Sequence, residues 1–450
     1  MSTPPDLREQ QLEPVQLNSP VDPSFLGFTP ASWLRLISEQ GPVFKTEYRG
    51  AEAYVIGTHE ADLSMWKSPE DWIYGPPSSG GDFFREVLGE MHVTQLDGEP
   101  HRRSRRLILP AFGVAAVTRD IEVVDEVITR GLKNLSSGDV DFHPDLSRLI
   151  AQALNVSQVR EQPDAGLIDQ MVYFEEGFIP ASGLGEERRR QWYERPDFQA
   201  ARAASFEYFE RVVSERLAGT KRGDSLDLVI EKAVPEGLAP LSRDELVRAT
   251  YLLSVAGVGN IANILCAALW ALQHSGQGPE WLDQLRKELE AFSVQELKSG
   301  MSKYPMLKAV ISETERCYLP APVIPKLSAH PMTFMGYDIP GHVHILHLHG
   351  LAHFEEGRYR NAGALDPSRW LEDSGVERAN AFGGGPHLCL GMGVTRLYVP
   401  LLLAHIIRDF DWQLAGPPVY VSQDEDFDGA PLTTACPGKL LPPGSIQGQA

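Results

Sequence analysis

Residues 381–393 read AFGGGPHLCLGMG, and this stretch decides how the whole chain is interpreted. Three consecutive glycines precede Pro386, His387 and Cys389, and Gly391 follows. A cysteine thiolate is a soft metal ligand, and glycine lets a backbone approach a flat ligand closely. The helix predicted behind the cysteine would turn its first N–H groups toward a negative sulfur. An isolated cysteine in a glycine loop can equally be a small buried hydrophobic residue, so the stretch alone leaves both roles open.

The composition is that of a large globular protein. The chain has 450 residues, of which 42% are hydrophobic, which is enough for a sizeable core. It carries 41 basic against 61 acidic residues, a net charge of -20, which argues against nucleic acid as a partner. Its four cysteines include no C-x-x-C pair, so the sequence indicates neither a disulfide framework nor a zinc site.

The ends of the chain and its longest apolar segment bear on location. We expect flexible tails over residues 1–25 and 441–450, around one domain that covers residues 26–440. The N-terminus shows neither a signal peptide nor a membrane anchor, so a cytoplasmic location is expected. Residues 249–272 carry no charge and are long enough to span a bilayer. The two asparagines near the middle of this segment favour instead a helix buried in a soluble domain.

The remaining pattern is mainly helical, with a smaller β portion. Residues 41–60 carry β-branched and aromatic side chains around a glycine turn and predict a hairpin. Ser242 and Glu245 form a capping box that opens one long apolar helix. Residues 304–318 predict a helix that two prolines end, and residues 332–348 alternate like short strands. A last helix follows the glycine-rich loop.

A pair of charged residues lies upstream of the loop. Glu313 and Arg316, in ISETER, are three residues apart, which places them on one helix face, and Arg369 follows in DPSRW. With this order and spacing to Cys389, the chain resembles the cytochrome P-450 superfamily over about residues 25–440. The family's cysteine-ligand loop has the pattern F-G-x-G-x-H-x-C-x-G, which is matched by Phe382, Gly383, Gly385, His387, Cys389 and Gly391.

The resemblance implies a fold and a cofactor. The fold is that of a cytochrome P-450, a single large domain that is mainly α with a smaller β portion. The cofactor is haem b, with Cys389 as the ligand of its iron, since a thiolate ligand favours cleavage of an O–O bond. The residues Glu313, Arg316 and Arg369 would form a buried structural triad.

Further residues resemble the family's haem contacts. His101 and Arg105, in DGEPHRRSRRL, match an H-x-x-x-R motif one helical turn apart, which suits the binding of a carboxylate. Lys326 and His387 lie at other positions that resemble partners of the haem propionates. The haem-binding residues expected from the resemblance are therefore His101, Arg105, Ala256, Gly257, Lys326, Phe382, His387, Cys389 and Gly391.

The resemblance also implies partners. The family's usual electron donors in bacteria are ferredoxin and its reductase, unless a peroxide drives the reaction, and we expect a bacterial biosynthetic pathway of secondary metabolism. Arg102, Arg103 and Arg106 could form a basic docking patch for an acidic donor, or simply a solvated helix face. The identity of the substrate and the oligomeric state stay open.

The central helix departs from the family pattern at the positions that relay protons. Residues 256–260 read AGVGN, where family members that activate dioxygen usually carry A-G-x-(D/E)-T. The acid has become Gly259, the alcohol has become Asn260, and no Asp or Glu occurs between Glu245 and Glu280. An amide can hold a water or a substrate oxygen but is not a proton-transfer acid near neutral pH. Gly259 and Asn260 are therefore the catalytic candidates, without the ordinary relay.

Three functional hypotheses follow. A monooxygenase would oxidise a small or medium apolar metabolite, with substrate hydroxyls, water or Asn260 organising the protons. A dioxygen-independent enzyme would rearrange or dehydrate its substrate, or use a peroxide. A non-catalytic helper would keep the fold to activate a partner enzyme, although it would have no need of the Cys389 ligand. The substrate pocket is expected to be bounded by Leu253, Val255, Ala256, Val258 and Ile261.

Five histidines lie close together in the alternating segment. His342 and His344 would share one face of a strand, so a metal site is conceivable. The resemblance places a strand and its turn here, and no acidic or cysteine ligand lies close by in sequence. We therefore expect structural roles for His342, His344, His347, His349 and His353.

Overall fold

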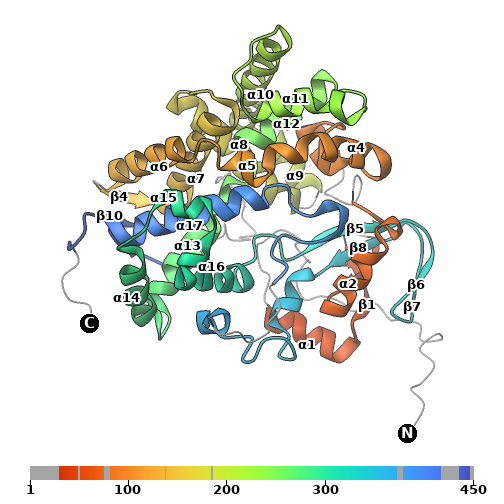
Figure 1. The fold of residues 1–450 in the computed structure, drawn as a ribbon. Coiled ribbons are helices and arrows are strands. Elements are labelled where there is room, and N and C mark those ends of the chain that lie inside the picture. Colours follow the sequence, from red (N-terminus) through yellow and green to blue (C-terminus); the bar gives the residue numbers. More distant parts are fainter. Residues whose placement is uncertain are drawn as a thin grey trace.

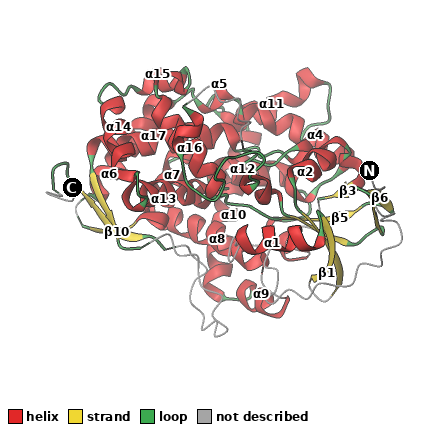
Figure 2. Ribbon diagram, turned by 90° about the horizontal axis from the view of Figure 1, so that it is seen from below, coloured by secondary structure: helices red, strands yellow, loops and turns green. Residues whose placement is uncertain are grey.

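The computed structural model describes residues 30–48, 51–74, 82–136, 138–183, 186–371, 379–416 and 435–445. Helices form most of the molecule, and short strands gather at two ends of the helical body (Figures 1 and 2). The prediction of a mainly α fold with a smaller β portion is therefore confirmed. The expected tail over residues 1–25 lies outside the described residues. The expected tail over residues 441–450 begins at Leu441, which is the last residue of strand β10. The structure describes this segment as far as residue 445.

The helices pack around α13, which contacts α7, α8, α14, α16 and α17. Their bounds are α1 Pro30–Gln40, α2 His59–Lys67, α3 Asp82–Leu88, α4 Gly98–Ile108, α5 Val114–Val117, α6 Ile121–Leu135, α7 Phe142–Leu154, α8 Ala165–Gly183, α9 Glu186–Tyr193, α10 Pro196–Leu217, α11 Ser225–Glu236, α12 Arg243–Ser254, α13 Val258–His274, α14 Gly278–Leu289, α15 Val294–Lys298, α16 Pro305–Cys317 and α17 Met392–Asp409. The helices predicted over residues 304–318 and behind the glycine-rich loop are α16 and α17, so both predictions are confirmed.

The strands form three sheets. The largest has the order β1-β2-β8-β5-β3, and the others are β4-β10-β9 and the pair β6-β7. The hairpin predicted over residues 41–60 is the antiparallel pair β1 and β2, which is therefore confirmed. The strand bounds are β1 Val43–Tyr48, β2 Ala51–Ile56, β3 Trp72–Ile73, β4 Asp139–Asp141, β5 Ile324–Ser328, β6 Met332–Phe334, β7 Tyr337–Ile339, β8 His344–His347, β9 Asp411–Leu414 and β10 Pro437–Leu441.

The long apolar segment runs through the middle of the protein. Its two helices, counted together as Arg243–His274, are long and apolar enough to cross a membrane, but 72% of the apolar window is buried inside the protein. A helix that is hydrophobic all round is typical of the core of a large domain. The capping box opens the segment as predicted, with the Ser242 hydroxyl accepting from the Glu245 N–H and the Glu245 carboxylate accepting from the Ser242 N–H.

The expected single helix is in fact two helices, which corrects the prediction of one continuous segment. α12 ends at Ser254 and α13 begins at Val258. Between them, Gly257 has φ 78°, a left-handed conformation that costs a residue with a side chain roughly 1–2 kcal/mol. The break interrupts the regular hydrogen-bond ladder, so the N–H of Gly257 bonds to a side chain of another helix. The consequence for the site is described below.

The structure brings the three residues of the expected triad together in the interior. Glu313 and Arg316 are fully buried and Arg369 is 8% exposed. Arg316 donates from Nη2 and Nε to the two carboxylate oxygens of Glu313 at 2.7 and 3.0 Å, and Arg369 Nε donates to Glu313 Oε1 at 3.0 Å. Trp370 Nε1 and the Asp366 N–H add two further bonds to the same carboxylate, each at 2.8 Å. This network ties α16 to the segment that follows the sheet.

Candidate active site

The glycine-rich loop folds tightly against α2. Gly383 and Gly385 have φ 71° and 67°, conformations that favour glycine. At Gly384 an added Cβ would lie 2.4 Å from ring atoms of Trp66, so a larger residue there would clash with the indole. The Cys389 N–H donates to the carbonyl oxygen of residue 382 at 3.1 Å, which closes the loop. The turn thus holds the cysteine in one position ahead of α17.

The Cys389 thiol is exposed, but only toward an internal cavity of about 410 Å³ that it lines. Burial raises the pKa of the thiol, whereas the N–H of Gly391, the guanidinium of Arg105 and the N–H of Met392 lower it. Two backbone N–H groups and one positive charge therefore act on the sulfur and oppose part of the effect of burial. Groups of this kind stabilise the negative charge that a sulfur carries when it binds a metal.

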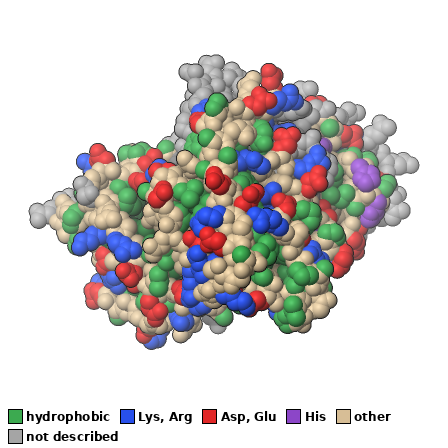
Figure 3. Space-filling model, turned by 90° about the horizontal axis from the view of Figure 1, so that it is seen from above, with side chains coloured by type: hydrophobic (Ala, Val, Ile, Leu, Met, Phe, Trp, Pro, Cys, Tyr) green, Lys and Arg blue, Asp and Glu red, His purple; other side chains and the backbone are tan. Residues whose placement is uncertain are grey.

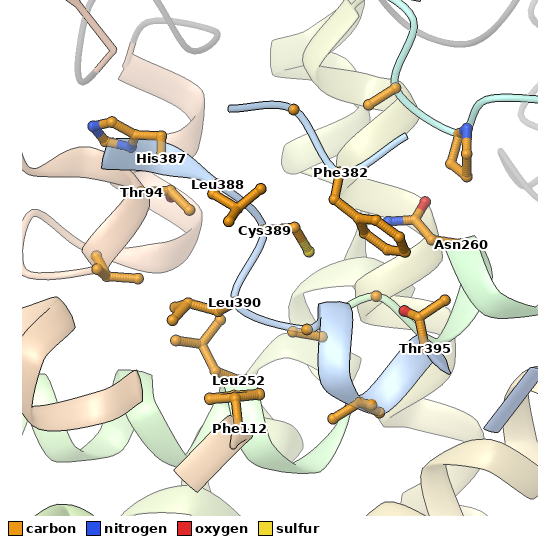
Figure 4. Close-up of a pocket in the computed structure, with 18 of the residues that line it drawn as sticks. Thr94, Phe112, Leu252, Asn260, Phe382, His387, Leu388, Cys389, Leu390 and Thr395 are labelled. Carbon is orange, nitrogen blue, oxygen red and sulfur yellow. The ribbon is translucent and has the colours of Figure 1, made fainter. Parts of the chain in front are cut away.

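The cavity lies between the cysteine loop and the break between α12 and α13. In Figure 4, Cys389 and Leu390 approach it from the loop, Leu252 and Asn260 from the central helices, and Phe112 from the segment after α4. All nine residues expected to bind haem line this one cavity, namely His101, Arg105, Ala256, Gly257, Lys326, Phe382, His387, Cys389 and Gly391.

One edge of the cavity is polar. The ring of His387 stacks between Tyr74 and His101, with ring centroids 4.1 and 3.9 Å apart. The carboxylate of Asp97 accepts from the Tyr74 N–H at 3.2 Å and lies 3.4 Å from His387 Nε2. Burial, with smaller contributions from His387 and Arg105, lowers the pKa of His101 to about 4. Near neutral pH, His101 is therefore a neutral imidazole that can donate one hydrogen bond.

These features fit a haem. A thiol lies at the floor of the cavity, where it would bind an iron ion. Arg105 and Lys326 supply cationic groups, and His101 and His387 supply ring N–H groups, for two carboxylates. The wall formed by Ala256, Ile261, Ile264, Phe382 and Val394 is apolar, as a porphyrin face requires.

Comparison with known proteins agrees with this fit. The family model described as Cytochrome P450 matches residues 193–427, just over half of the chain. This chain belongs to the cytochrome P450 family. It is 22% identical to cytochrome P450 708A2 of Arabidopsis thaliana, over 87% of this chain and 82% of that protein. It is 25% identical to the cytochrome P450 monooxygenase stcF of Emericella nidulans, over 84% and 82% of the two proteins.

A solved structure shows the same fold. The retinoic-acid-bound cyanobacterial CYP120A1 superposes with a TM-score of 0.75, over 93% of this chain and 95% of that one. The two sequences are 20% identical, so this likeness concerns the fold. The predicted membership of the cytochrome P-450 superfamily is confirmed, and with it the haem-thiolate oxidoreductase class.

Lys326 of this P450 begins a buried polar chain that leads away from the cavity. Its Nζ lies 2.7 Å from His347 Nδ1, and His347 Nε2 lies 2.5 Å from Asp62 Oδ1. Burial lowers the pKa of Lys326 to about 7, an effect that the charge of Asp62 opposes. Burial raises the pKa of Asp62 and lowers that of His347 well below its usual value. The lysine is thus linked through His347 of β8 to Asp62 of α2.

The other histidines of the cluster have separate partners. His349 Nε2 contacts the Ala321 carbonyl, and His353 Nδ1 lies 3.2 Å from the Arg316 carbonyl. Among the described residues, no group of three or more His, Cys, Asp or Glu side chains is arranged to hold a metal ion. These contacts favour the structural roles that we expect for the cluster.

The structure separates the two catalytic candidates of the central helix. Asn260 lines the cavity, whereas Gly259 does not and faces α7 and α8. The predicted pocket boundary is wrong for three residues, because Leu253, Val255 and Val258 are fully buried and do not line the cavity. The break between α12 and α13 interrupts the helical period here, and Val258 lies two residues from both Ala256 and Asn260, away from the face that residues four apart share. The cavity face of the central helices carries Leu252, Ala256, Gly257, Asn260, Ile261 and Ile264.

Sequence reasoning missed several residues of the cavity wall. Trp66 and Tyr74 come from α2 and the segment after β3, and Glu175 and Tyr251 come from α8 and α12. A glutamate inside an otherwise apolar helical stretch, MVYFEEGF, was the available indication for Glu175. Charged residues are almost never fully buried without a function or a partner.

The three arginines beside the H-x-x-x-R motif are paired with acids. Arg103 Nη1 lies 2.7 Å from Glu245, Arg106 Nη2 lies 2.5 Å from Glu236, and Arg102 Nη2 lies 2.9 Å from Glu99. Over the face in Figure 3, acidic and basic side chains are interspersed. Because each arginine has an acidic partner, these pairs favour the interpretation as a solvated helix face over a basic docking patch.

Proposed function

We propose that this P450 is a haem-thiolate monooxygenase that oxidises a small or medium apolar metabolite. The observation that carries the proposal is the thiol of Cys389, held by a glycine-rich loop at the floor of a largely apolar cavity with a cationic edge. The electron donors would be ferredoxin and its reductase. We place the enzyme in the cytoplasm, in a bacterial pathway of secondary metabolism.

Each part of the cavity has a role in this proposal. Haem b, when bound to Cys389, supplies the redox chemistry that inserts an oxygen atom into the substrate. Arg105 and Lys326, with the rings of His101 and His387, would hold its carboxylates. The apolar wall would orient the substrate by shape and exclude water from it.

Asn260 supports a second candidate function. Its amide lines the cavity, and the central helix carries no acid between Glu245 and Glu280. An amide can bind the oxygen of a peroxide or of a polar substrate by hydrogen bonds. The alternative is therefore a haem-thiolate enzyme that rearranges or dehydrates its substrate or is driven by a peroxide. A non-catalytic helper of a partner enzyme is a further alternative, which the retained Cys389 disfavours.

The first experiment tests the cysteine ligand. Reduced protein with carbon monoxide should show the absorption band of thiolate-ligated haem, and Cys389→Ser should abolish that band because a hydroxyl is a harder, poorer ligand. Cys436→Ser is the matched control, since this thiol does not line the cavity and lies away from the triad, just ahead of β10. A histidine-type spectrum in freshly folded wild-type protein would contradict the proposal.

The second experiment separates the candidate functions. Purified protein is given a panel of apolar substrates, either with NAD(P)H, ferredoxin and reductase or with a peroxide alone. Turnover that depends on NAD(P)H and dioxygen supports the monooxygenase. Turnover with the peroxide, but none with NAD(P)H, ferredoxin and reductase, supports the alternative.

A further inference from the structure

Two adjacent glutamates of α8 are buried against the break between α12 and α13. Glu175 is 2% exposed and Glu176 is 8% exposed, although neither pairs with a lysine or arginine through any ion pair found among the described residues. Unpaired buried acids are costly, because burial disfavours the charged form. Their position therefore calls for an explanation beyond packing.

Glu175 reaches the cavity that Cys389 lines. Its Oε1 accepts from the Gly257 N–H at 2.7 Å, and its Oε2 accepts from the hydroxyl of Tyr251. Glu175, Tyr251 and Gly257 all line that cavity, as does Asn260. The left-handed turn at Gly257 presents the N–H that holds the carboxylate at this place. An acid from α8 is thus fixed at the cavity wall beside the central helix.

Glu176 lies directly beside the position that a side chain on Gly259 would take. A Cβ added to Gly259 would be 3.4 Å from both Cγ and Oε1 of Glu176, and 3.6 Å from Cε1 of His143. His143 Nε2 lies 3.2 Å from the Gly259 carbonyl oxygen, and its Nδ1 lies 3.5 Å from Glu176 Oε1. Within the described residues, Glu176 Oε1 and His143 Nδ1 have no hydrogen-bond partner. The space beside the central helix is therefore occupied by an acid of another helix.

We propose that Glu175 is the proton-relay acid of this P450, with Glu176 and His143 behind it, in place of the acid and alcohol that the central helix lacks. This inference rests on the proposed monooxygenase function. In that reaction dioxygen takes two electrons from the donor and two protons. One oxygen atom enters the substrate C–H bond and the other leaves as water. Glu175 would release protons into the cavity and regain them from the side of Glu176.

The surroundings of the two acids suit proton transfer near neutral pH. Burial raises the pKa of Glu175 to about 7, against the lowering effect of the Gly257 N–H and the Tyr251 hydroxyl. Burial raises the pKa of Glu176 to about 8; the charges of Glu175 and Asp141 add to this shift, and Ser147 and Arg148 oppose it. Burial lowers the pKa of His143 to about 4, so this ring is neutral. A general acid is most effective when its pKa lies near the working pH.

A purely structural role for Glu175 makes different predictions. In that role the carboxylate would only accept hydrogen bonds from Tyr251 and from the Gly257 N–H ahead of α13. Glutamine retains an acceptor oxygen at this place but cannot release a proton. Glu175→Gln can therefore keep an acceptor for the Gly257 N–H and donate its amide to the Tyr251 oxygen, while it removes the relay. Glu288→Gln is the matched control, because Glu288 accepts the N–H groups of Met306 and Leu307 at the start of α16 and does not line the cavity.

The test compares NAD(P)H-driven and peroxide-driven turnover. In Glu175→Gln we expect unchanged haem content and carbon monoxide spectrum, and a roughly 10-fold or greater fall in product formed per NAD(P)H consumed. Turnover with hydrogen peroxide should be largely retained, because peroxide brings both protons with its oxygen atoms. NAD(P)H coupling within twofold of the wild type and of Glu288→Gln would overturn the relay. Absence of NAD(P)H-driven turnover in the wild type would instead contradict the proposed function itself.

Infrared spectroscopy gives a readout that does not depend on turnover. The wild-type protein should show a protonated carboxyl band that titrates near about pH 7 and is lost in Glu175→Gln. If Glu175→Gln does not retain haem, Glu176→Gln tests the assignment instead. The band of Glu175 must remain in that variant, because only Glu176 is replaced. Because Asp62 also has a raised pKa, the band is assigned by difference between spectra. An unchanged titrating carboxyl region between wild type and Glu175→Gln, or between Glu176→Gln and the double variant, would overturn the assignment.

Discussion

Glu313 and Glu175 are both buried glutamates, yet their partners differ completely. Glu313 accepts from two guanidinium groups, of Arg316 and Arg369, and from two further N–H donors. Glu175 accepts from one N–H and one hydroxyl, both of them neutral. The first carboxylate sits among fixed positive charges, and the second has none bonded to it.

This difference teaches that burial alone does not assign a role to an acid. Two arginines donate to the buried carboxylate of Glu313, and removing one member of such a network strands a charge in the interior. Neutral donors compensate only part of the cost of burial, so the pKa of Glu175 is raised to about 7. The same residue type therefore serves as a permanent anchor on α16 and as a proton-exchanging group on α8.

The largest effect is expected from Glu313→Ala. The change leaves two guanidinium groups buried without their carboxylate, at a cost on the order of 3–5 kcal/mol. We expect haem-poor or insoluble protein, measured as soluble yield, haem content per chain and the midpoint of thermal unfolding. Normal yield with full haem occupancy would show that the network contributes little, and the contrast with Glu175 would then fail.

A smaller and opposite effect is expected from Glu175→Gln at high pH. Because the folded-state pKa of Glu175 is raised from 4.5 to about 7, the folded protein holds this proton more tightly than the unfolded chain does. Wild-type stability therefore falls as the pH rises from about 4.5 through about 7, by about 3 kcal/mol at most. Glutamine does not ionise, so the variant should gain stability relative to wild type as the pH is raised.

Thermal or denaturant unfolding at about pH 5 and about pH 9 measures this difference. Comparing wild type and variant at each pH cancels the titration of groups that Glu175 does not influence, such as His143, whereas Glu176 is coupled to Glu175 and its change counts with it. A stability difference that stays constant across this range, or that favours the wild type at high pH, would mean that Glu175 does not carry the raised pKa. The comparison with Glu313 would then rest on geometry alone.

Local sequence patterns were enough to predict the cysteine loop and the charged pair. The loop concentrates Gly383, Gly385, Cys389 and Gly391 within ten residues, and Gly383 and Gly385 have positive φ angles that favour glycine. The E-x-x-R spacing likewise fixes a shared helix face. The family resemblance rests on short-range patterns such as these. The expected fold and the expected haem contacts are what the resemblance implies.

The sequence could not predict contacts between distant segments. Glu175 and Gly257 are 82 positions apart, and Trp370 is 57 positions from Glu313. Nothing in the period of α8 indicates that its acids face the break in the central helix.

The smallest effect is expected from an exposed pair with the same spacing as the triad. Glu99 and Arg102 are also three residues apart on a helix, with Arg102 Nη2 2.9 Å from Glu99 Oε2, but their side chains are 75% and 67% exposed. Water and salt screen this pair, and ordering two long side chains offsets much of the attraction, so Glu99→Ala should cost about 0.5 kcal/mol or less. Haem content and the unfolding midpoint should stay close to wild type, and added salt should remove the residual difference. A loss comparable with that of Glu313→Ala would mean that the Glu-Arg spacing itself, rather than its burial and its second arginine, sets the stability of this P450.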